Sequence, residues 1–316
     1  MTCYQRNIYL WSTLMMNITR CFQDIRLFKA VTGMTYAEFT ALLPAFEAAL
    51  THHTLTNRAS RQRQEGGGRK HTLATEREKL FFIIFFVKCY ATFDILAWLF
   101  EVDRAQTYRW VTAYLPVLEQ ALGRKAVLPE RKIATVEEFL QRFPQVKEVF
   151  VDGTERPIRR PTGAEAQRPY YSGKKKGHRL KNVVVTTARK RVIVLSETFP
   201  GHTHDKTGAN DHDIFAPIPE EGLIHLDLGF LGVPKERPNG RFSLPEKKPK
   251  GRPLPEEAKE RHREKARRRV LVEHALGGVK RVRAVADVLR NSLTVFGDRL
   301  MLIACGIWNL HIEMTA

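Results

Sequence analysis

The apolar positions of this chain follow a helical period in its first part and a strand-like pattern after it. Residues 31–56 and 73–123 carry apolar side chains at helical spacing, and Thr35 is placed to cap a helix that buries Phe39. Between residues 148 and 197 the pattern changes to short runs of β-branched residues, which are typical of strands. This change predicts a domain boundary at about residues 130–147.

Three short helices are predicted within residues 74–115. The first covers residues 74–90, the second covers residues 92–100, and Asp103 is placed to cap the third. A tight link between the last two is typical of a helix-turn-helix, whose final helix reads the major groove of DNA. A plain bundle of three amphipathic helices explains the same pattern, so both interpretations stay open. The side chains that would reach base edges and phosphates are Arg104, Gln106, Thr107 and Arg109.

The second half of the chain is predicted to combine strands and helices with one long loop. The pair Arg189–Lys190 is placed to turn a hairpin between two of the strands. Residues 229–255 are rich in Pro, Gly and Lys, which indicates a loop. The predicted strands cover residues 148–152 or a little beyond, 180–187, 191–197 and 223–226, and the predicted helices cover about residues 204–215, 256–286 and 293–312.

The net charge of the chain indicates what kind of molecule it binds. Its 52 Lys and Arg residues against 34 Asp and Glu residues give a net charge of +18. Such an excess favours a polyanion, and nucleic acid is the first expectation. A membrane surface ranks second, because the positive charge does not follow one face of a long amphipathic helix.

Other sequence features bear on where the protein acts. The four cysteines are scattered without a C-x-x-C pair, which favours a reducing cytoplasm over a disulfide framework or a zinc knuckle. The longest apolar run, residues 80–87, is shorter than the ~20 residues that a membrane-spanning helix needs. Residues 1–30 lack the pattern of a signal peptide and are expected to form a peripheral extension.

Two carboxylates follow two predicted strands directly. The apolar run Val149–Val151 precedes Asp152, and the run Leu223–Leu226 precedes Asp227. If these strands are neighbours, the two acids converge at one edge of a sheet, where their repulsion is costly unless a divalent cation lies between them. Mg²⁺ prefers such oxygen ligands.

A third carboxylate lies in the long basic helix. Arg269, Glu273 and Lys280 are separated by one and two helical turns, so they share one face. That face would let the carboxylate bind metal while the two cations hold a DNA backbone. Each acid alone has an ordinary explanation, as a turn residue or as the partner of a neighbouring cation; only their combination points to chemistry.

The combination resembles a known family. The segments that carry the resemblance are residues 151–158 (VDGTERPI), His204–Asp205, residues 226–230 (LDLGF), and residues 272–275 (VEHA) with Lys280–Arg281. They are similar to the DDE-type transposases of bacterial insertion sequences, in order and spacing, over about residues 73–312.

The resemblance implies a fold, an activity and a set of ligands. It implies a ribonuclease-H-like mixed sheet with flanking helices, in which Asp152, Asp227 and Glu273 bind two Mg²⁺ ions, with Mn²⁺ as a possible substitute. The family signature around the last acid is Tyr, Arg, Glu and Lys; Arg269, Glu273 and Lys280 match it, whereas Ala266 stands where the tyrosine belongs. The implied reaction cuts a phosphodiester at the transposon end and joins the freed 3′ hydroxyl to target DNA.

A basic segment follows Asp152 directly. Residues 156–181 hold nine Lys and Arg residues against one Glu, including Lys174, Lys175 and Lys176. We expect this segment to contact DNA, with Tyr170 and Tyr171 able to stack on an unpaired base near the cut. Residues 247–255 and 259–269 are expected to continue the same positive surface.

A histidine-rich cluster has two interpretations. His202, His204, Asp205, His212 and Asp213 could form a zinc site, or Asp205 could cap a short helix; the second interpretation is favoured.

The sequence therefore predicts an α/β protein in three parts. These are an N-terminal helical extension with a basic linker (1–72), a helix-turn-helix domain (73–130) and a ribonuclease-H-like catalytic domain (145–316). The expected function is a transposase that binds double-stranded DNA, both the terminal inverted repeats and the target, as a homodimer or larger assembly in the cytoplasm, at the nucleoid, with no membrane partner. The alternative is a catalytically inactive DNA-binding protein derived from a transposase.

Overall fold

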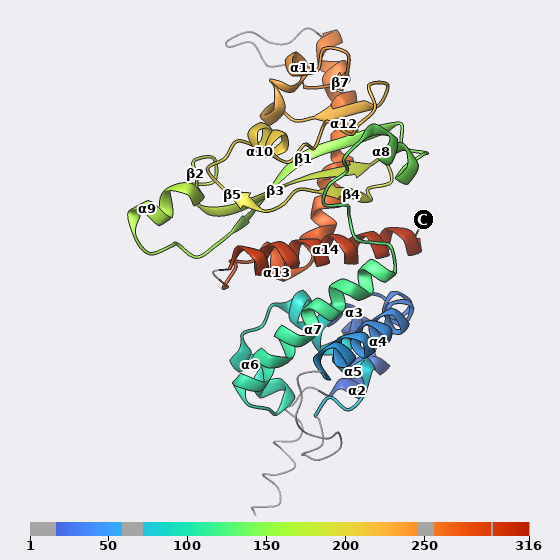
Figure 1. The fold of residues 1–316 in the computed structure, drawn as a ribbon, viewed down its shortest axis with the longest axis vertical. Coiled ribbons are helices and arrows are strands. Elements are labelled where there is room, and N and C mark those ends of the chain that lie inside the picture. The colour runs from blue at the N-terminus through green and yellow to red at the C-terminus, as the bar shows by residue number, and fades with distance from the viewer. Residues whose placement is uncertain (1–16, 59–71, 246–255, 292, 316) are drawn as a thin grey trace, which may run out of the picture. The chain divides into compact units, whose positions relative to one another are not determined.

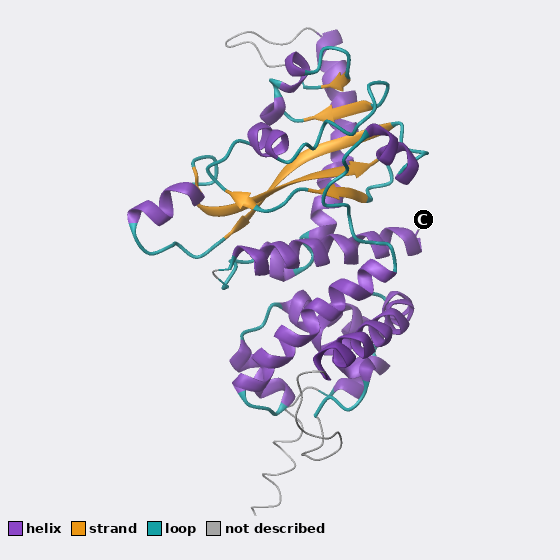
Figure 2. Cartoon of the chain, in the orientation of Figure 1, coloured by secondary structure: helices purple, strands orange, loops and turns teal. Residues whose placement is uncertain are grey.

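The chain divides into two compact units. The structure is a computed structural model that describes residues 17–58, 72–245, 256–291 and 293–315. The first unit comprises Met1–Val127 with Val282–Ala284, and the second comprises Leu128–Arg281 with Val285–Ala316. Among the described residues every strand lies in the second unit, and the first unit is helical (Figure 2).

The first unit is built around α5. Every side chain from Leu80 to Val87 is buried, because a helix that is apolar all round must be enclosed by others. The ring of Phe81 lies 6.3 Å from that of Phe28, and the ring of Phe82 lies 5.2 Å from that of Trp110. The helices of this unit are α2 (Ile18–Gln23), α3 (Ile25–Thr32), α4 (Tyr36–Arg58), α5 (Glu76–Cys89), α6 (Phe93–Phe100) and α7 (Arg104–Arg124).

The helix starts of this unit agree with the sequence in part. Thr35 caps α4 as predicted, because its hydroxyl accepts a hydrogen bond from Glu38 N at 3.2 Å. The helical region predicted over residues 31–56 is not one continuous helix, because Gly33 takes a left-handed φ of 72° and ends α3 before α4 begins. Asp103 precedes α7, but its side chain makes no capping hydrogen bond.

The second unit is organised by a mixed sheet. Its strand order is β2-β3-β1-β6-β7, and both β4 and β5 pair with β3 (Figure 1). Strand β1 is antiparallel to β3 and parallel to β6, and β7 is parallel to β6. The hairpin predicted at Arg189–Lys190 is confirmed, because β3 and β4 pair antiparallel on either side of it. The strands are β1 (Glu148–Pro157), β2 (Tyr171–Ser172), β3 (Gly177–Thr187), β4 (Val192–Leu195), β5 (Phe199–Pro200), β6 (Leu223–Leu226) and β7 (Arg241–Ser243).

Helices flank this sheet. Helix α12 packs against β1 and against α14, and it passes behind the strands in Figure 1. A Cβ on Gly278 would lie 2.2 Å from the ring of Trp308, so only glycine lets α12 and α14 approach this closely. The helical segments of the second half are α8 (Val136–Arg142), α9 (Ala164–Gln167), η1 (Arg168–Tyr170), α10 (Asp205–Asp211), η2 (Leu228–Phe230), α11 (Val233–Glu236), α12 (Glu256–Val279), α13 (Arg283–Ala286) and α14 (Thr294–Thr315).

Helix α14 is a core element. By length and composition it is the one helix of the described residues that could cross a membrane, with a mean hydropathy of 1.2. However, 61% of the 18-residue apolar segment of this helix is buried inside the protein. Its Asn309 is fully buried and bonds the backbone of Val192 through both amide atoms, at 2.8 and 2.7 Å. This buried amide satisfies the backbone polar groups of Val192 in β4 and so attaches α14 to the sheet. The apolar helix therefore belongs to the core of the second unit.

Two predicted boundaries in the second unit are wrong, and one strand is longer than its predicted core. The strand predicted over residues 148–152 or a little beyond continues to Pro157 as β1. The predicted helix over residues 256–286 stops at Val279, after two glycines, and a turn separates it from α13. The predicted loop contains η2, α11 and β7 up to residue 245, whereas residues 246–255 lie outside the described residues.

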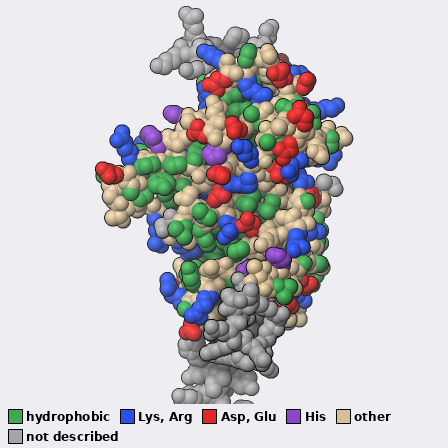
Figure 3. Space-filling view, in the orientation of Figure 1, with side chains coloured by type: hydrophobic (Ala, Val, Ile, Leu, Met, Phe, Trp, Pro, Cys, Tyr) green, Lys and Arg blue, Asp and Glu red, His purple; other side chains and the backbone are tan. Residues whose placement is uncertain are grey.

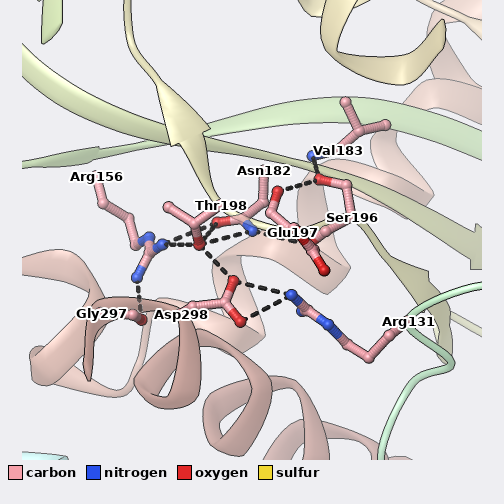
Figure 4. A network of polar contacts seen from close by, with 9 residues as sticks. All are labelled: Arg131, Arg156, Asn182, Val183, Ser196, Glu197, Thr198, Gly297 and Asp298. Atoms are coloured by element: carbon pink, nitrogen blue, oxygen red, sulfur yellow. Dashed lines mark hydrogen bonds and ion pairs between the residues drawn. The ribbon is translucent and has the colours of Figure 1, made fainter. Parts of the chain in front are cut away.

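A buried polar network joins β1 to α14. Arg156 is 2% exposed and donates to Gly297 O at 2.5 Å and to Asn182 Oδ1 at 2.9 Å (Figure 4). Thr198 connects this arginine to Asp298, which also holds Arg131 at 2.7 Å. Burial lowers the pKa of Arg156 to about 10. Arg156 was expected on the DNA-facing surface; that expectation is wrong, because its charge is enclosed by these partners.

Candidate active site

Asp152 and Asp227 emerge side by side from neighbouring strands. In the parallel pair β1–β6, Val151 lies opposite Leu226, so the next residue on each strand is an aspartate. Asp152 Oδ1 accepts from Gly153 N at 2.8 Å, and Asp227 Oδ1 accepts from Leu228 N at 2.6 Å. The convergence expected from the sequence is confirmed, because the two strands are neighbours and run in the same direction.

The electrostatics of Asp152 reflect this convergence. Burial, and then the negative charge of Asp227, raise the pKa of Asp152 to about 6, while Gly153 N and Arg269 act in the opposite direction. A buried carboxyl beside a second carboxylate holds its proton more tightly, because ionisation would place two like charges together. Such a pair is stabilised by a cation.

Helix α12 supplies that cation from the protein itself. Arg269 Nη1 lies 3.3 Å from Asp227 Oδ1, and its Nη2 lies 3.4 Å from Glu273 Oε1. The helix is fixed to the sheet nearby, because Arg268 contacts Glu148 Oε1 at 2.9 Å and Glu148 Oε2 lies 3.0 Å from His225 Nε2. These contacts join the start of β1, the strand β6 and the helix that carries the third acid.

The three predicted acids line one cavity. Asp152, Asp227 and Glu273 all border a cavity of about 720 Å³, which we call the first cavity. Among its other lining residues are four cations: Lys174, Lys175, Arg179 and Lys280. Burial lowers the pKa of Lys280, and the charge of Asp152 opposes that effect. Acids beside cations would suit a phosphodiester held against metal ions.

Asp205 is a further carboxylate in this cavity. Its Oδ1 accepts from Lys181 Nζ at 3.0 Å, and both side chains are largely buried. A Cβ on Gly153 would lie 2.8 Å from Asp205 Cγ, and one on Gly229 would lie 3.2 Å from Asp205 Oδ2. The residue after Asp152 within β1 and a residue of η2 after Asp227 therefore both pack on the same carboxylate.

Sequence reasoning missed this arrangement. It interpreted Asp205 as a helix cap, but the residue before α10 is His204, and no side chain caps this helix. Asp205 instead pairs with Lys181, which is 8% exposed and was counted among the DNA contacts. The available signal was the polar pair Lys181–Asn182 directly before the apolar run Val183–Val185 of the same strand.

The histidine cluster, for which a zinc site was the less favoured interpretation, is not brought together. His212 Nδ1 lies 2.7 Å from Gly208 O, and its ring contacts Phe199, whereas His202 borders a different cavity. No group of three or more His, Cys, Asp or Glu side chains capable of holding a metal is present in the described part of the chain.

Comparison with known proteins decides the family. The model for the DDE superfamily endonuclease matches residues 151–309, just over half of the chain, and this segment contains Asp152, Asp227 and Glu273. The chain belongs to the DDE superfamily endonucleases. It is similar to the probable transposase for insertion sequence element IS702 of Microchaete diplosiphon, with 27% identity over 296 residues that cover 92% of this chain and 96% of that protein. No solved structure matches the chain. The resemblance to DDE-type insertion-sequence transposases is thus confirmed.

Members of the DDE family generally use divalent metal ions, and the acids of this chain fit such ions in part. Asp152 and Asp227 fit as they stand, because they are adjacent oxygen donors whose repulsion a divalent ion would relieve. Glu273 borders the same cavity but is turned to Arg269, and its side chain is 57% exposed. The three acids therefore share a cavity without forming a closed set of ligands.

The predicted DNA contacts of this family member fall in different places. Lys174 and Lys175 border the first cavity, whereas Lys176 borders a second one. In α7, Arg104 and Arg109 are exposed and Gln106 is half-buried. Thr107 is fully buried, and its hydroxyl donates to Arg104 O at 2.8 Å. We therefore exclude Thr107 from the DNA contacts, because a buried hydroxyl cannot reach DNA while the helix stays packed.

The face drawn in Figure 3 carries charges of both signs. On the face drawn in Figure 3, Lys and Arg side chains alternate with Asp and Glu side chains. The net charge of +18 therefore does not appear there as one continuous basic patch. Cations gather at particular cavities, where a phosphate would be close to several of them at once.

Proposed function

We propose that this chain is a transposase that binds the ends of its insertion sequence and catalyses metal-dependent cleavage and strand transfer of DNA. The observation that carries the proposal is the pair Asp152 and Asp227, which leave parallel strands side by side in a cavity that Glu273 also borders. Cationic side chains surround these acids, as a polyanionic substrate requires. The inactive DNA-binding alternative is not favoured, because all three acids are present in one cavity.

We infer a ribonuclease-H-like fold for the catalytic part, residues 145–316. The antiparallel series β4-β3-β1, extended by β6 and β7 parallel to β1, supports this inference. Residues 73–130 would be the helix-turn-helix domain, and residues 1–72 the helical extension with its basic linker. The left-handed turn at Glu101, with φ of 54°, supports the tight link between α6 and α7.

The proposed mechanism assigns roles to the residues of the first cavity. Asp152, Asp227 and Glu273 would hold two divalent ions, Mg²⁺ or in its place Mn²⁺, which supply positive charge at the attacking and leaving oxygens of the phosphodiester. Lys174, Lys175 and Lys280 would bind the phosphates on either side of the cleaved bond. Asp152 must lose its proton before it can act as a ligand, and its pKa is raised to about 6 without metal, so metal binding would compete with this proton.

Arg269 would have two successive partners in this mechanism. The guanidinium contacts Asp227 and Glu273, so it neutralises the acids while no substrate is bound. When ions are bound, the same side chain would turn to a phosphate of the DNA, because its favourable carboxylate contacts would be replaced. The proposed partners are double-stranded element ends and target DNA, held by a homodimer or larger assembly in the cytoplasm, at the nucleoid.

The test is strand cleavage of DNA that carries the flanking element ends, with Mg²⁺ or with EDTA. Asp152→Asn and Glu273→Gln are each expected to abolish Mg²⁺-dependent nicking at the element boundary while leaving DNA affinity at a fixed salt concentration unchanged. Glu221→Gln is the matched control, because Glu221 is exposed and does not border the first cavity. Unchanged cleavage in Asp152→Asn would refute the ligand assignment. DNA binding by the wild type without any cleavage of paired ends would favour the inactive alternative.

A further inference from the structure

A second cavity lies beside the first, at the end of the sheet that carries α9 and β2. It has a volume of about 580 Å³, and the residues that matter for its chemistry are Arg160, Arg168, Tyr171, Lys176, His178 and His202. In Figure 1 the segment of α9 and β2 projects from the left edge of the sheet. No acidic side chain borders this cavity, which distinguishes it from the first.

The walls of the second cavity are held by hydrogen bonds of their own. Arg160 Nε donates to Gln167 Oε1 at 2.9 Å, and Gln167 Nε2 donates to Pro161 O at 2.9 Å. His202 N donates to Pro169 O at 2.9 Å, which joins the turn after β5 to η1. These bonds fix the walls before any ligand arrives, so little ordering would be needed on binding.

Its cations are not neutralised by carboxylates. Among the described residues, no ion pair to Asp or Glu is formed by Arg168 or Lys176, and the hydrogen bond of Arg160 goes to a neutral amide. Three cations without counter-charges around one hollow favour an anionic ligand, and guanidinium groups suit phosphate oxygens in particular.

An aromatic surface lies in the same cavity. Tyr171 is 44% exposed, and its ring meets the ring of His178 edge to face at a centroid distance of 5.7 Å. Tyr171 and His178 are direct partners across the β2–β3 pair, so the backbone ladder fixes their relative position. An exposed ring held in this way offers a flat surface on which a nucleobase can stack.

One turn connects the two cavities. Lys174 and Lys175 border the first cavity, and the next residue, Lys176, borders the second. Lys175 and Lys176 are consecutive residues, so the same turn of the chain contributes a cation to each cavity. Lys176 has a φ of 49°, and this left-handed residue reverses the chain between β2 and β3.

We propose that the second cavity binds an unpaired nucleotide of the DNA strand whose neighbouring phosphate enters the first cavity. The base stacks on Tyr171, and Arg168 and Lys176 bind the phosphate. A paired base does not fit this role, because its faces are covered by its neighbours in the duplex. The choice of DNA as the ligand rests on the proposed function, whereas the preference for an unpaired nucleotide rests on the cavity itself.

The test compares the binding of two DNA probes to the full chain in EDTA, so that cleavage plays no part. One probe is a blunt duplex, and the other is the same duplex with a single-stranded overhang of about four nucleotides that carries 2-aminopurine. We expect about tenfold tighter binding of the overhang probe, measured by fluorescence anisotropy at one fixed salt concentration. We also expect quenching of the 2-aminopurine fluorescence on binding, since a stacked base is quenched.

Two variants separate stacking from charge. Tyr171→Ala is expected to lose the preference for the overhang and the quenching, while Tyr171→Phe keeps both because the ring remains. Lys176→Gln is expected to weaken overhang binding more than Lys235→Gln, which removes the same charge from an exposed site outside both cavities. Equal affinity of the wild type for the two probes would overturn the proposal, as would an equal loss for both probes in Tyr171→Ala.

The outcomes for this cavity and for the proposed function are separable. Asp152→Asn should keep both the overhang preference and the quenching, since Asp152 does not border the second cavity. A Tyr171-dependent preference in a protein that cleaves no DNA would support the nucleotide site and refute the transposase activity. Metal-dependent cleavage without any overhang preference would refute the nucleotide site alone.

Discussion

Arg269 and Asp227 form an ion pair across the candidate active site, with 3.3 Å between Nη1 and Oδ1. Each side chain is 29% exposed, so the pair is partly shielded from water. The same guanidinium also contacts Glu273 at 3.4 Å. A protein cation thus lies where two proposed metal ligands meet, and metal binding must compete with it.

Replacement of Arg269 by Gln is expected to strengthen metal binding and weaken cleavage. Without the guanidinium, Asp227 and Glu273 keep their charges with no internal cation, so a divalent ion gains more by binding them. Mn²⁺ titration followed by electron paramagnetic resonance should give an affinity several-fold above that of the wild type, with Arg263→Gln as the control on the same helix. Weaker Mn²⁺ binding in Arg269→Gln would contradict the competition.

The raised pKa of Asp152 predicts a pH-dependent stability in the absence of metal. The native carboxyl titrates at about 6 and the unfolded one near 3.8, so between these values the native state binds more protons. The free energy of unfolding should therefore fall as pH rises from about 4 to about 6, by on the order of 3 kcal/mol at most. Urea unfolding in EDTA would measure it, and Asp152→Asn should lack this component. An identical pH profile in the two proteins would show that Asp152 is not its source.

Gly153→Ala is expected to disturb the acids through Asp205. The new Cβ would lie 2.8 Å from Asp205 Cγ, and Asp205 cannot easily retreat because Lys181 holds it at 3.0 Å. We expect a loss of roughly 1–3 kcal/mol in the free energy of unfolding, as for other overpacked sites. Gly173→Ala is the control, since no atom lies within 4 Å of its added Cβ.

A double-mutant cycle tests the proposed contact directly. If the clash with Asp205 causes the loss, Gly153→Ala should cost less in an Asp205→Ala background. Strict additivity of the two substitutions would mean that the added methyl group acts on some other neighbour.

The network around Arg156 is expected to be a major source of stability for the second unit. Asp298→Ala removes the carboxylate that accepts from Thr198 and pairs with Arg131 at 2.7 Å. Breaking such a partly buried pair from one side should cost about 3 kcal/mol, because the remaining charge loses its partner. Chemical denaturation would measure the loss against Asp211→Ala, an exposed acid at the end of α10. A cost below that of the control would mean that the network is replaceable by water.

The sequence alone determined the elements with strong local signals. The apolar runs before Asp152 and Asp227 specified two buried strands, and the all-apolar run Leu80–Val87 specified a buried helix. Such patterns are readable because burial of one face or of a whole element repeats with the period of the backbone. The same periodic patterns singled out the three acids. Asp152 and Asp227 follow apolar runs, Glu273 shares a helix face with two cations, and the family resemblance joined them.

Only the tertiary structure decided which polar side chains face inward and what they contact. Arg156 and Lys181 lie in a basic segment, and yet one binds α14 and the other binds Asp205. Thr107 lies among exposed polar residues of α7 but is buried against the carbonyl of Phe93. The partners of these side chains are far apart along the chain. A periodic pattern shows on which side of a helix or strand a residue lies, but it does not show which other element packs against that side. Charge and polarity were therefore properties of the sequence, whereas the assignment of each charge to a cavity, an ion pair or the core was a property of the fold.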